Sequence, residues 1–521
     1  MIDTSLLPLW VLAAVGLTAI YVYFKVSFSY WKKRGVPILN PTPPFGDIGA
    51  VIFTRKNASE LINECYKEFD GKKFGGLYNF TMPILLVRDP EVIKDILVKD
   101  FEKFHSRGIA VNEKQDPFQG HLFALSGSKW RNLRVKLSPT FTSGKMKMMF
   151  GTMVECGKEL QECLQDTANN RETIEIKDIL ARYSTDIIAS CAFGIQCNCL
   201  KNPDAEFRKW GRKIFEPSFV AKLSRALMLV APSLRRFLKF PPKEVGKYFM
   251  EMVKETVEYR EKNDMKRNDF MQLLIQMKNK TLGVAEEEDI KLGNLEEDDL
   301  KSIAPFEVTI EVMAAQAFVF FLAGFETSST TMTFCLYELA LNPDIQQRLR
   351  AEIDTVLHKH GGNITYDSIF EMEYLEKVVD ETLRKYPAAT LLQRQCSKST
   401  KIRGTDVAVE KGVLIMVPIF GLHHDPKYYP DPERFDPERF SEEEKKKRPH
   451  FSYLPFGEGP RICIGMRFGL MQTKVGLISL LSRYEVRVSE KTPIPLVFDS
   501  RSVVLASEGG MWLTVVKRTD K

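Results

Sequence analysis

The feature that most constrains this chain is a glycine-rich turn at 456–465, which delivers a single cysteine to the start of a helix. It reads Phe-Gly-Glu-Gly-Pro-Arg-Ile-Cys-Ile-Gly. Gly457 and Gly459 allow backbone angles that are closed to other residues, and Pro460 stiffens the turn. Apolar residues recur at helical spacing from Cys463 onward. We therefore expect this cysteine near a helix N-terminus, where free N–H groups and the helix dipole favour a thiolate.

A single thiolate limits what this loop can bind. No second cysteine and no histidine lies within ten residues of Cys463, and structural zinc takes four ligands, so a zinc site is disfavoured. Haem iron needs only one axial donor, because the porphyrin supplies the other ligands, and Cys463 is a candidate for that donor. Taken alone, the cysteine could equally be a small buried residue in a turn.

Length and composition narrow the class of protein. A chain of 521 residues exceeds one ordinary core, yet no Gly/Ser-rich or Pro-rich linker divides its interior, which predicts one large, mostly helical unit. The 74 Lys and Arg against 68 Asp and Glu give a net charge of +6, too mild to indicate nucleic acid as a partner. Nine dispersed cysteines, an odd number, argue against a secreted disulfide scaffold. The cluster Cys191, Cys197 and Cys199 is interpreted as ordinary thiols.

The N-terminus indicates a membrane anchor. Residues 6–24 carry no charge and are about long enough to cross the hydrocarbon core, and four cations at 25–34 follow them. The positive-inside rule then predicts residues 1–24 as a retained anchor with the bulk of the protein in the cytosol. A cleaved signal peptide would open on positive charge and close on small residues, and neither is in place. Residues 25–46, basic and proline-rich, predict a semi-rigid hinge before a catalytic domain at 47–521.

A long apolar helix is predicted from about 306 to 341, with Ala-Gly-Phe-Glu-Thr-Ser at 323–328 inside it. Glycine in an apolar helix costs about 1 kcal/mol relative to alanine, so Gly324 requires a reason, such as a local widening that leaves room for a diatomic ligand. Glu326 followed by Thr327 can hold water and pass protons inward. A lone threonine more often bonds back to its own helix, and that alternative stays open.

Two ion-bearing helices add further candidates. Trp130 and Arg134 lie four residues apart and share one helix face, which by itself is typical of a surface cation–π pair. Glu381 and Arg384, on a helix that ends at Tyr-Pro, form an i, i+3 pair that is usually solvated. Arg439, in Pro-Glu-Arg-Phe, is a second arginine available to the same carboxylate.

Together these motifs resemble those of the cytochromes P450, in family order and over essentially the whole chain. The turn at 456–465 resembles the haem-thiolate loop, and 323–328 resembles the oxygen-activation motif. The segment Trp-Lys-Lys-Arg-Gly-Val-Pro at 31–37 and Cys-Ala-Phe-Gly at 191–194 are most similar to insect microsomal P450s of the detoxification-rich group.

The resemblance implies roles for individual residues. Cys463 is the axial ligand of the iron of haem b, and Glu326 and Thr327 are the catalytic pair that promotes O–O cleavage. The residues that bind the cofactor are Trp130, Arg134, Ala323, Gly324, Arg394, Phe456, Arg461 and Cys463. Glu381, Arg384 and Arg439 form a structural network that holds the haem-side core together.

The resemblance also implies a fold and a function. The fold is mainly α with small β-sheets (α+β), the P450 fold, with haem between the long helix and the helix after Cys463. The activity is a monooxygenase that uses O2 to oxidise hydrophobic small molecules, such as plant toxins, insecticides or other xenobiotics. No flavin or nicotinamide fingerprint is present, so electrons are expected from NADPH through NADPH–cytochrome P450 reductase at the endoplasmic reticulum membrane, with cytochrome b5 as an additional donor.

Three alternatives remain at this stage: oxidation of an endogenous lipid, steroid or hormone; a haem-thiolate isomerase or lyase; and a non-enzymatic haem sensor. The intact pair Glu326 and Thr327 counts against an isomerase or lyase, because proton delivery matters mainly when O2 is cleaved.

Several segments carry expectations about the substrate pocket and the surface. The candidate lining segments are 105–122, 205–238, 315–326, 388–393 and 503–510, and the resemblance makes 207–262, with the apolar run 226–232, a mobile lid. Five phenylalanines are equally consistent with an apolar pocket and with core packing: Phe118, Phe123, Phe318, Phe320 and Phe321.

The charged runs 286–299 and 442–448 are predicted as solvated loops. Shorter patterns predict a helix at 58–67, strands at 75–80, 84–88, 390–396, 407–409 and 413–418, and a helix capped by Asp89 that begins near Val92.

Overall fold

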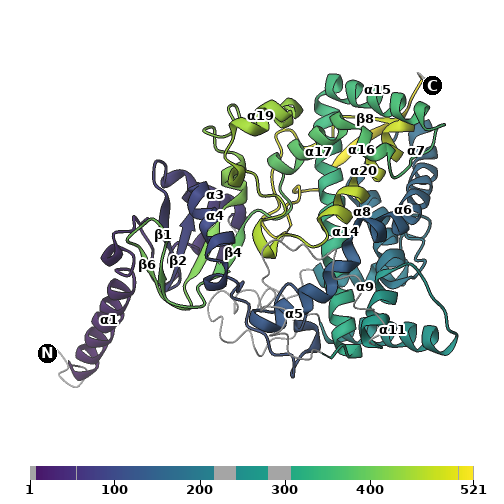
Figure 1. The fold of residues 1–521 in the computed structure, drawn as a ribbon. Coiled ribbons are helices and arrows are strands. Elements are labelled where there is room, and N and C mark those ends of the chain that lie inside the picture. Colours follow the sequence, from purple (N-terminus) through teal and green to yellow (C-terminus); the bar gives the residue numbers. More distant parts are fainter. Residues whose placement is uncertain (1–6, 54–55, 216–241, 280–306, 503, 520–521) are drawn as a thin grey trace.

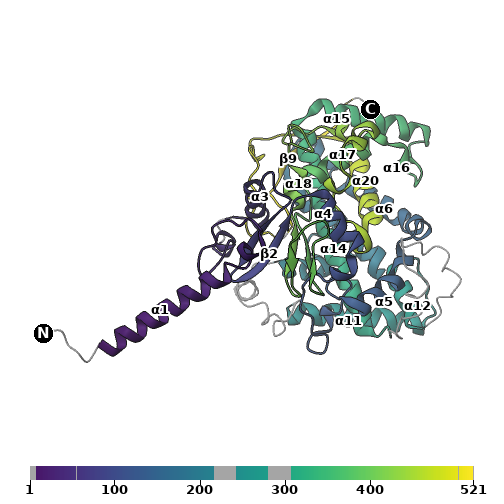
Figure 2. The same ribbon diagram turned by 60° about the vertical axis from the view of Figure 1, so that its left-hand side comes forward.

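The computed structural model describes residues 7–53, 56–215, 242–279, 307–502 and 504–519. The predicted apolar run at 226–232 and the acidic segment at 286–299 lie outside these ranges. A large helical body is joined to a smaller part that is built around a four-stranded sheet, which we call the sheet-containing part. One helix projects from this smaller part (Figure 1). The rotated view shows the same projection of α1 away from the body (Figure 2).

Helices make up most of the described chain. The first half contains α1 (Leu7–Ser27), α2 (Gly49–Ile52), α3 (Ala58–Glu68), α4 (Pro90–Lys94), α5 (Gly127–Leu137), α6 (Ser143–Cys163), α7 (Gln165–Asn169), α8 (Ile176–Ile188), α9 (Glu206–Phe215) and α11 (Lys243–Lys262). The second half contains α12 (Phe270–Lys278), α14 (Ile310–Leu341), α15 (Pro343–Lys359), α16 (Ser368–Glu371), α17 (Glu373–Lys385), α18 (Ile419–His423), α19 (Glu442–Lys447) and α20 (Met466–Arg483).

The strands form three small sheets. The four-stranded sheet has the order β1 (Phe74–Asn79), β2 (Met82–Val87), β7 (Leu414–Val417) and β4 (Leu392–Gln395). Only β2 and β7 run parallel in it, with Ile84 opposite Leu414. A second sheet has the order β3 (Thr173–Glu175), β9 (Trp512–Lys517) and β8 (Tyr484–Arg487), and a third pairs β5 (Thr400–Lys401) with β6 (Ala408–Val409). The predicted mainly α fold with small β-sheets is confirmed.

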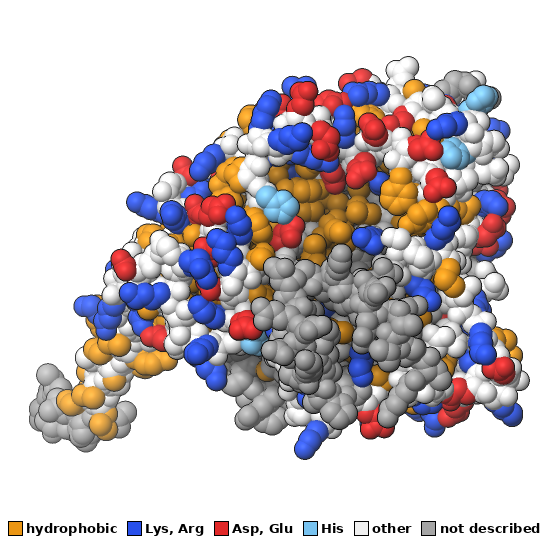
Figure 3. Space-filling model, viewed as in Figure 1, with side chains coloured by type: hydrophobic (Ala, Val, Ile, Leu, Met, Phe, Trp, Pro, Cys, Tyr) orange, Lys and Arg blue, Asp and Glu red, His pale blue; other side chains and the backbone are white. Residues whose placement is uncertain are grey.

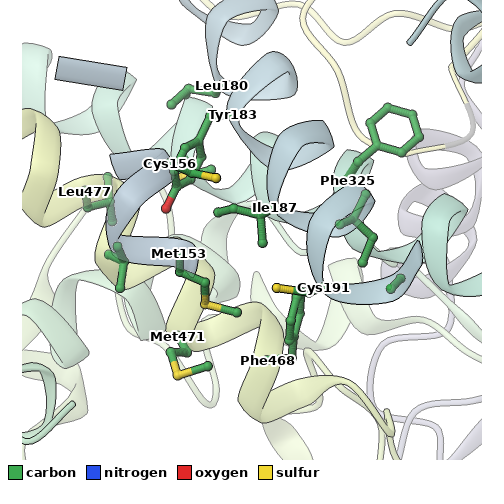
Figure 4. Packing of buried hydrophobic residues seen from close by; sticks show 14 of the residues in the cluster. Met153, Cys156, Leu180, Tyr183, Ile187, Cys191, Phe325, Phe468, Met471 and Leu477 are labelled. Atoms are coloured by element: carbon green, nitrogen blue, oxygen red, sulfur yellow. The ribbon is translucent and has the colours of Figure 1, made fainter. Parts of the chain in front are cut away.

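Helix α14 runs through the middle of the helical body and is buried along most of its length. Figure 4 shows buried side chains of α6, α8, α14 and α20 that belong to one hydrophobic cluster, among them Met153, Ile187 and Phe325. Gly476 of α20 allows this approach, since a Cβ there would lie 2.6 Å from Met332 Sδ and 2.8 Å from Tyr183 Cε1. The core therefore fixes α14 between the helices on either side of it.

The segment after α1 is packed against the sheet and is not a free spacer. Trp31 has no exposed surface and Val36 is buried with it in the core of the sheet-containing part. The indole Nε1 of Trp31 donates to the carbonyl of Leu77 at 3.2 Å. Glu410 accepts hydrogen bonds from the Tyr30 hydroxyl and from the Arg34 guanidinium. The predicted hinge at 25–46 therefore contains residues that belong to the core.

Two described helical segments are long and apolar enough to cross a membrane: Trp10–Arg34, which overlaps α1, and Ile310–Leu341. The second is α14, which the core surrounds, whereas the most apolar 18-residue stretch of the first has no buried residue. The candidate anchor is thus the N-terminal segment.

Some predicted boundaries were wrong. The charged run at 442–448 is a short helix, α19, because the Ser441 hydroxyl caps the Glu444 N–H at 3.4 Å and glutamates precede lysines along the dipole. The helix capped by Asp89 begins at Pro90, since proline suits the first helical position. The long helix begins at Ile310, where Thr309 caps it. The helix after the cysteine begins at Met466.

Candidate functional site

The cysteine loop depends on two glycines with positive φ. Gly457 has φ 72° and Gly459 has φ 75°. A Cβ on Gly459 would lie 2.2 Å from the carbonyl oxygen of Leu97, so this position excludes any side chain. The Cys463 N–H donates to the carbonyl of Phe456 at 2.9 Å, which closes the loop immediately before α20. The loop therefore holds Cys463 in a fixed backbone conformation between the sheet-containing part and α20.

The environment of Cys463 differs from the sequence-based expectation. Its side chain keeps solvent-accessible surface, although protein atoms surround it deep in the molecule. Burial raises the pKa of the Cys463 thiol, while the Gly465 N–H, Arg134 and Arg107 act in the opposite direction. The helix α20 begins only at Met466, so Cys463 lies before its first turn and not within it. A metal ion at the sulfur would remove the proton, since a coordinating thiol is deprotonated.

Three arginines from separate elements carry buried N–H groups that have no hydrogen-bond partner among the described residues. These groups are Nε of Arg134 on α5, Nε of Arg394 on β4, and Nε and Nη1 of Arg461 in the cysteine loop. One nitrogen of Arg461 donates to the Leu125 carbonyl at 2.6 Å and one of Arg394 to the Gln393 carbonyl at 2.9 Å. Unpaired buried donors are costly, so the remaining groups point to an anionic acceptor with several oxygens.

Mutual repulsion among these cations leads to the same conclusion. Burial lowers the pKa of Arg394 to about 10. Burial, followed by the charges of Arg107, Arg394 and Arg134, lowers the pKa of Arg461 to about 8. Guanidinium groups stay charged in proteins, so such shifts express positive charge that lacks a counter-ion. The two propionates of haem would neutralise it, and together with Cys463 these residues fit an iron porphyrin.

Trp130 takes part in this cluster through a partner other than the predicted one. Its ring lies beneath the Arg461 guanidinium, whose central carbon is 4.2 Å from the ring centroid. Trp130 and Arg134 are both buried on α5, so the surface cation–π alternative does not apply. This stacking holds the Arg461 guanidinium over the Trp130 ring and so fixes the direction in which its unpaired N–H groups point.

Arg107 is a member of the cluster that the sequence did not reveal. Burial, Arg394 and Arg134 lower its pKa to about 9. Its guanidinium donates to the Phe123 carbonyl at 2.9 Å and stacks on the Phe123 ring at 4.2 Å. Gln393, next to Arg394 on β4, donates to the Arg107 carbonyl at 2.9 Å. No local motif marks this arginine, because it reaches the cluster through pairing with a strand almost 300 residues away.

The glycine in α14 has a packing role. A Cβ on Gly324 would lie 2.6 Å from Cδ1 of Ile188 on α8, so the missing side chain is replaced by a neighbouring helix. The expected local widening is not observed, since α14 is helical without interruption from Ile310 to Leu341. The Thr327 hydroxyl donates to the Ala323 carbonyl at 2.6 Å, the back-bonded geometry that the sequence left open. Ala323 is exposed on the same turn.

Glu326 is held from outside its own helix. Lys177, in the first turn of α8, donates to Glu326 Oε1 at 2.7 Å. The two side chains are 25% and 16% exposed, so the pair is partly desolvated. This contact joins the two helices on the side of α14 that carries the acid.

Glu381, Arg384 and Arg439 lie together in the core. Arg384 donates two hydrogen bonds of 2.7 and 2.9 Å to the Glu381 carboxylate, and neither side chain is exposed. The Nε atom of Arg439 lies 3.5 Å from Glu381 Oε1. His423, whose role the sequence did not reveal, completes the arrangement. Its Nδ1 faces the Arg384 carbonyl at 3.2 Å and its Nε2 accepts from the Leu454 N–H at 2.9 Å. Burial keeps the pKa of His423 well below its usual value, so this neutral ring joins α17 to the approach of the cysteine loop.

The five phenylalanines divide between core and surface. Phe118, Phe318 and Phe321 are buried, Phe320 packs against the rings of Phe141 and Phe270, and Phe123 is 52% exposed beneath Arg107. Hydrophobic side chains also gather in a hollow between the sheet-containing part and the helical body (Figure 3). Most of the aromatic residues of α14 therefore stabilise the core.

Comparison with known proteins identifies the family. The family model described as Cytochrome P450 matches residues 37–514. The chain is 44% identical to Cytochrome P450 6k1 of Blattella germanica, covering 98% of this chain and 97% of that protein. It is 43% identical to Probable cytochrome P450 6a14 of Drosophila melanogaster, covering 97% and 99%. The chain belongs to the cytochrome P450 family of haem-containing monooxygenases.

Proposed function

We propose that this P450 hydroxylates or epoxidises hydrophobic small molecules, with xenobiotics such as plant toxins or insecticides as its substrates. Electrons come from NADPH through NADPH–cytochrome P450 reductase, and cytochrome b5 is an additional donor. The single observation that carries the proposal is the convergence of one accessible cysteine with buried arginines whose N–H groups have no partner among the described residues.

In this proposal the chain's own residues divide the work. Cys463 holds the iron of haem b, and Trp130, Arg134, Arg394 and Arg461 hold the propionates. Bound haem supplies the binding and reduction of O2 and the transfer of one oxygen atom to the substrate.

The remaining site residues act around this group. Phe456, Ala323 and Gly324 contribute to the walls that enclose the cofactor. Glu326 and Thr327 move protons inward from solvent, for which the Thr327 hydroxyl must leave its bond to the Ala323 carbonyl. Glu381, Arg384 and Arg439 keep the elements around the cysteine loop in place.

The proposed setting is the endoplasmic reticulum membrane, with residues 1–24 as the single anchor, 25–46 as the connection and 47–521 as the cytosolic catalytic domain. The apolar surface of α1 supports this arrangement, because Trp10, Leu12 and Leu17 are all strongly exposed. Membrane residence would also bring the enzyme close to a membrane-bound reductase and to substrates that partition into lipid.

The substrate class rests on the hollow of hydrophobic side chains and on the relationship to insect P450s. An endogenous lipid, steroid or hormone is the alternative substrate, and it requires the same haem and the same electron supply. Screening both classes of compound for spectral binding distinguishes them before any product is measured.

The first test is the difference spectrum of reduced, CO-bound protein in membranes, for wild type and for Cys463→Ser. A strongly red-shifted Soret band in wild type that is lost in the variant supports thiolate ligation. Bound haem without that band in wild type would contradict the assignment of Cys463. Substrate-dependent consumption of NADPH with reductase then separates an oxygenase from a haem-thiolate isomerase, a lyase or a haem sensor, none of which needs those electrons.

A further inference from the structure

A cavity of about 340 Å³ lies between α8, α9 and α14 and reaches the Glu326 carboxylate. Helix α8 lines it with Lys177, Ala181 and Thr185, which share one face because they are spaced by four residues. Arg212 of α9 lines it as well and is exposed, so the cavity extends to the protein surface. The side chain of Glu326 therefore projects from α14 toward a cavity that opens to the protein surface.

The part of the cavity formed by α14 is otherwise apolar. Phe321 and Phe325 are buried and stacked, with ring centroids 4.8 Å apart. Gly211 of α9 fits against them, since a Cβ there would lie 2.5 Å from Cζ of Phe321. Among the residues that line the cavity, Glu326 is the polar side chain that α14 contributes. Glu326 is therefore the titratable group of α14 that water in this cavity can reach.

The cation that holds Glu326 has no competing acid beside it on α8. Asp178, the next residue, accepts hydrogen bonds from Arg182 and from Arg208 of α9, so its charge is already compensated. The Glu175 carboxylate caps α8 by accepting from the Asp178 N–H at 2.7 Å and also accepts from the Met511 N–H at 2.9 Å. Lys177 is thus left for Glu326, to which it donates at 2.7 Å.

We propose that Lys177 is a positioning residue, which holds the Glu326 carboxylate at the inner wall of this cavity so that it can take protons from entering water. The inference rests on the proposed role of Glu326 in proton supply. The bond to Oε1 fixes the rotamer of the glutamate, and Oε2 then exchanges the proton. Without Lys177 the carboxylate turns among its rotamers, and misplacement by about 1 Å is enough to reduce a proton-transfer step severely.

The expected consequence is a change in the fate of O2. In the coupled reaction, two electrons and two protons per O2 yield one water, and the second oxygen atom enters the substrate. When protons do not arrive at the correct place, the same two electrons and two protons leave with both oxygen atoms as hydrogen peroxide. Lys177 therefore affects the ratio of product to NADPH consumed more than it affects substrate binding.

The test compares Lys177→Met, Lys177→Arg, Glu326→Gln and the double variant Lys177→Met/Glu326→Gln, each with bound haem, reductase and one oxidisable substrate. We expect Lys177→Met to lower the yield of product per NADPH at least threefold and to raise hydrogen peroxide correspondingly, with KM for the substrate unchanged. Lys177→Arg should restore the yield to within twofold, and the double variant should be no worse than Glu326→Gln. Lys158→Met, which removes an exposed lysine paired with Glu155 on α6, is the control.

A second measurement is independent of turnover. Urea unfolding midpoints of wild type, Lys177→Met, Glu326→Gln and the double variant should be non-additive, because either single variant already breaks the ion pair. An unchanged product yield in Lys177→Met, together with a lowered yield in Glu326→Gln, would overturn the role of Lys177 alone. An unchanged yield in Glu326→Gln would overturn the proposed role of Glu326 itself, and with it this inference. Additive midpoints would show that the two side chains do not interact.

Discussion

At the scale of single residues, four cations of this protein lie close together, and no carboxylate of the described residues forms an ion pair with them. Arg107, Arg134, Arg394 and Arg461 come from a loop, a helix, a strand and the cysteine loop, and each has a pKa lowered by burial. Such a cluster is unfavourable until an anion enters it. The affinity for the cofactor is therefore partly a release of repulsion between protein groups, in addition to the bonds formed with it.

Arg107→Ala tests this idea on the residue that no motif marks. Loss of this cation beside the proposed propionate site should weaken haem retention roughly 10- to 150-fold, since a charge-assisted hydrogen bond contributes about 1.5–3 kcal/mol. The haem-free variant should instead unfold at a higher urea concentration than the haem-free parent, because one repelling charge is gone. Transfer of haem to an acceptor protein measures the first effect. Arg403→Ala, which removes a 52% exposed arginine paired with Asp100, should change neither quantity appreciably.

His424 predicts a pH dependence of stability. Burial, with Arg384 and Lys385 nearby, lowers its pKa to about 3 from an ordinary value near 6.5. The unfolded chain therefore binds this proton first, so the stabilisation is complete above pH 6.5 and is lost as the pH falls toward 3. The loss from this one group between pH 7 and pH 5 should be about 2 kcal/mol.

His424→Phe is the variant that isolates this contribution, because the ring stacks on Phe420 with centroids 4.1 Å apart and phenylalanine preserves that contact. Its free energy of unfolding should fall less steeply than that of wild type between pH 7 and pH 5. The comparison of slopes matters because Asp47 and Asp380, whose pKa values burial raises to about 6, act in the opposite direction. Parallel slopes for the two proteins would contradict the assignment to His424.

At the scale of secondary structure, the position of residues 323–328 depends on how closely α8 and α14 approach. Gly324 faces Ile188 and Lys177 holds Glu326, so the same helix pair sets both the packing and the position of the acid. A change in this contact should therefore alter stability and the geometry at Glu326 together.

Gly324→Ala should destabilise the protein by about 1 kcal/mol, because overpacking costs roughly 1–3 kcal/mol and exceeds the helix propensity gained. Ile188→Val removes the Cδ1 atom that a Cβ would meet at 2.6 Å, so the double variant should recover most of the loss due to alanine. Gly151→Ala on α6 is the matched control, since nothing lies within 4 Å of its added Cβ, and it should stabilise by roughly 0.5–1 kcal/mol. Equal effects of the two alanines in chemical unfolding would contradict the packing role.

The sequence predicts those parts of the site that are encoded by short spacing. Phe456, Arg461 and Cys463 lie in one turn, and the positive φ of Gly457 and Gly459 follows from that turn's composition. The resemblance supplied distant members such as Arg134 and Arg394, but two others, Arg107 and Lys177, were not predictable. Arg107 depends on the pairing of its loop with β4, and Lys177 on the crossing of α8 with α14. Neither contact leaves a periodic or local signal. A local widening was one possible reason for Gly324, and the contact with Ile188 supplies another, because a glycine in a helix serves close packing as readily as it serves a ligand.

At the scale of the whole molecule, the sheet-containing part links the proposed anchor α1 to the helical body. Trp31 and Val36 are buried in its core, and the Tyr78 hydroxyl donates to the Phe28 carbonyl at 2.9 Å. The end of α1 at Ser27 is therefore the last position at which the chain can be cut without removing core residues.

Two truncations separate anchoring from folding. A protein without residues 2–27 should keep its thermal unfolding midpoint and its CO-difference spectrum while losing most of its membrane association. A protein without residues 2–36 should be destabilised by about 3–5 kcal/mol, the usual cost of removing a buried tryptophan. Fractionation and thermal unfolding of both proteins make the comparison. Equal stability of the two would mean that Trp31 does not contribute to the core.

The hydrogen bonds that Tyr30 and Arg34 donate to Glu410 affect how often the enzyme would meet its proposed electron donor in an orientation that allows electron transfer. A catalytic body joined to its anchor by a flexible linker would rotate freely above the bilayer, and in most collisions its donor-binding surface would face away from the partner. A body fixed to its anchor retains only lateral diffusion and spin about the membrane normal. In the proposed membrane setting the encounter becomes a planar search with one free angle, and a carboxylate outside the proposed haem site helps to set the fraction of productive collisions.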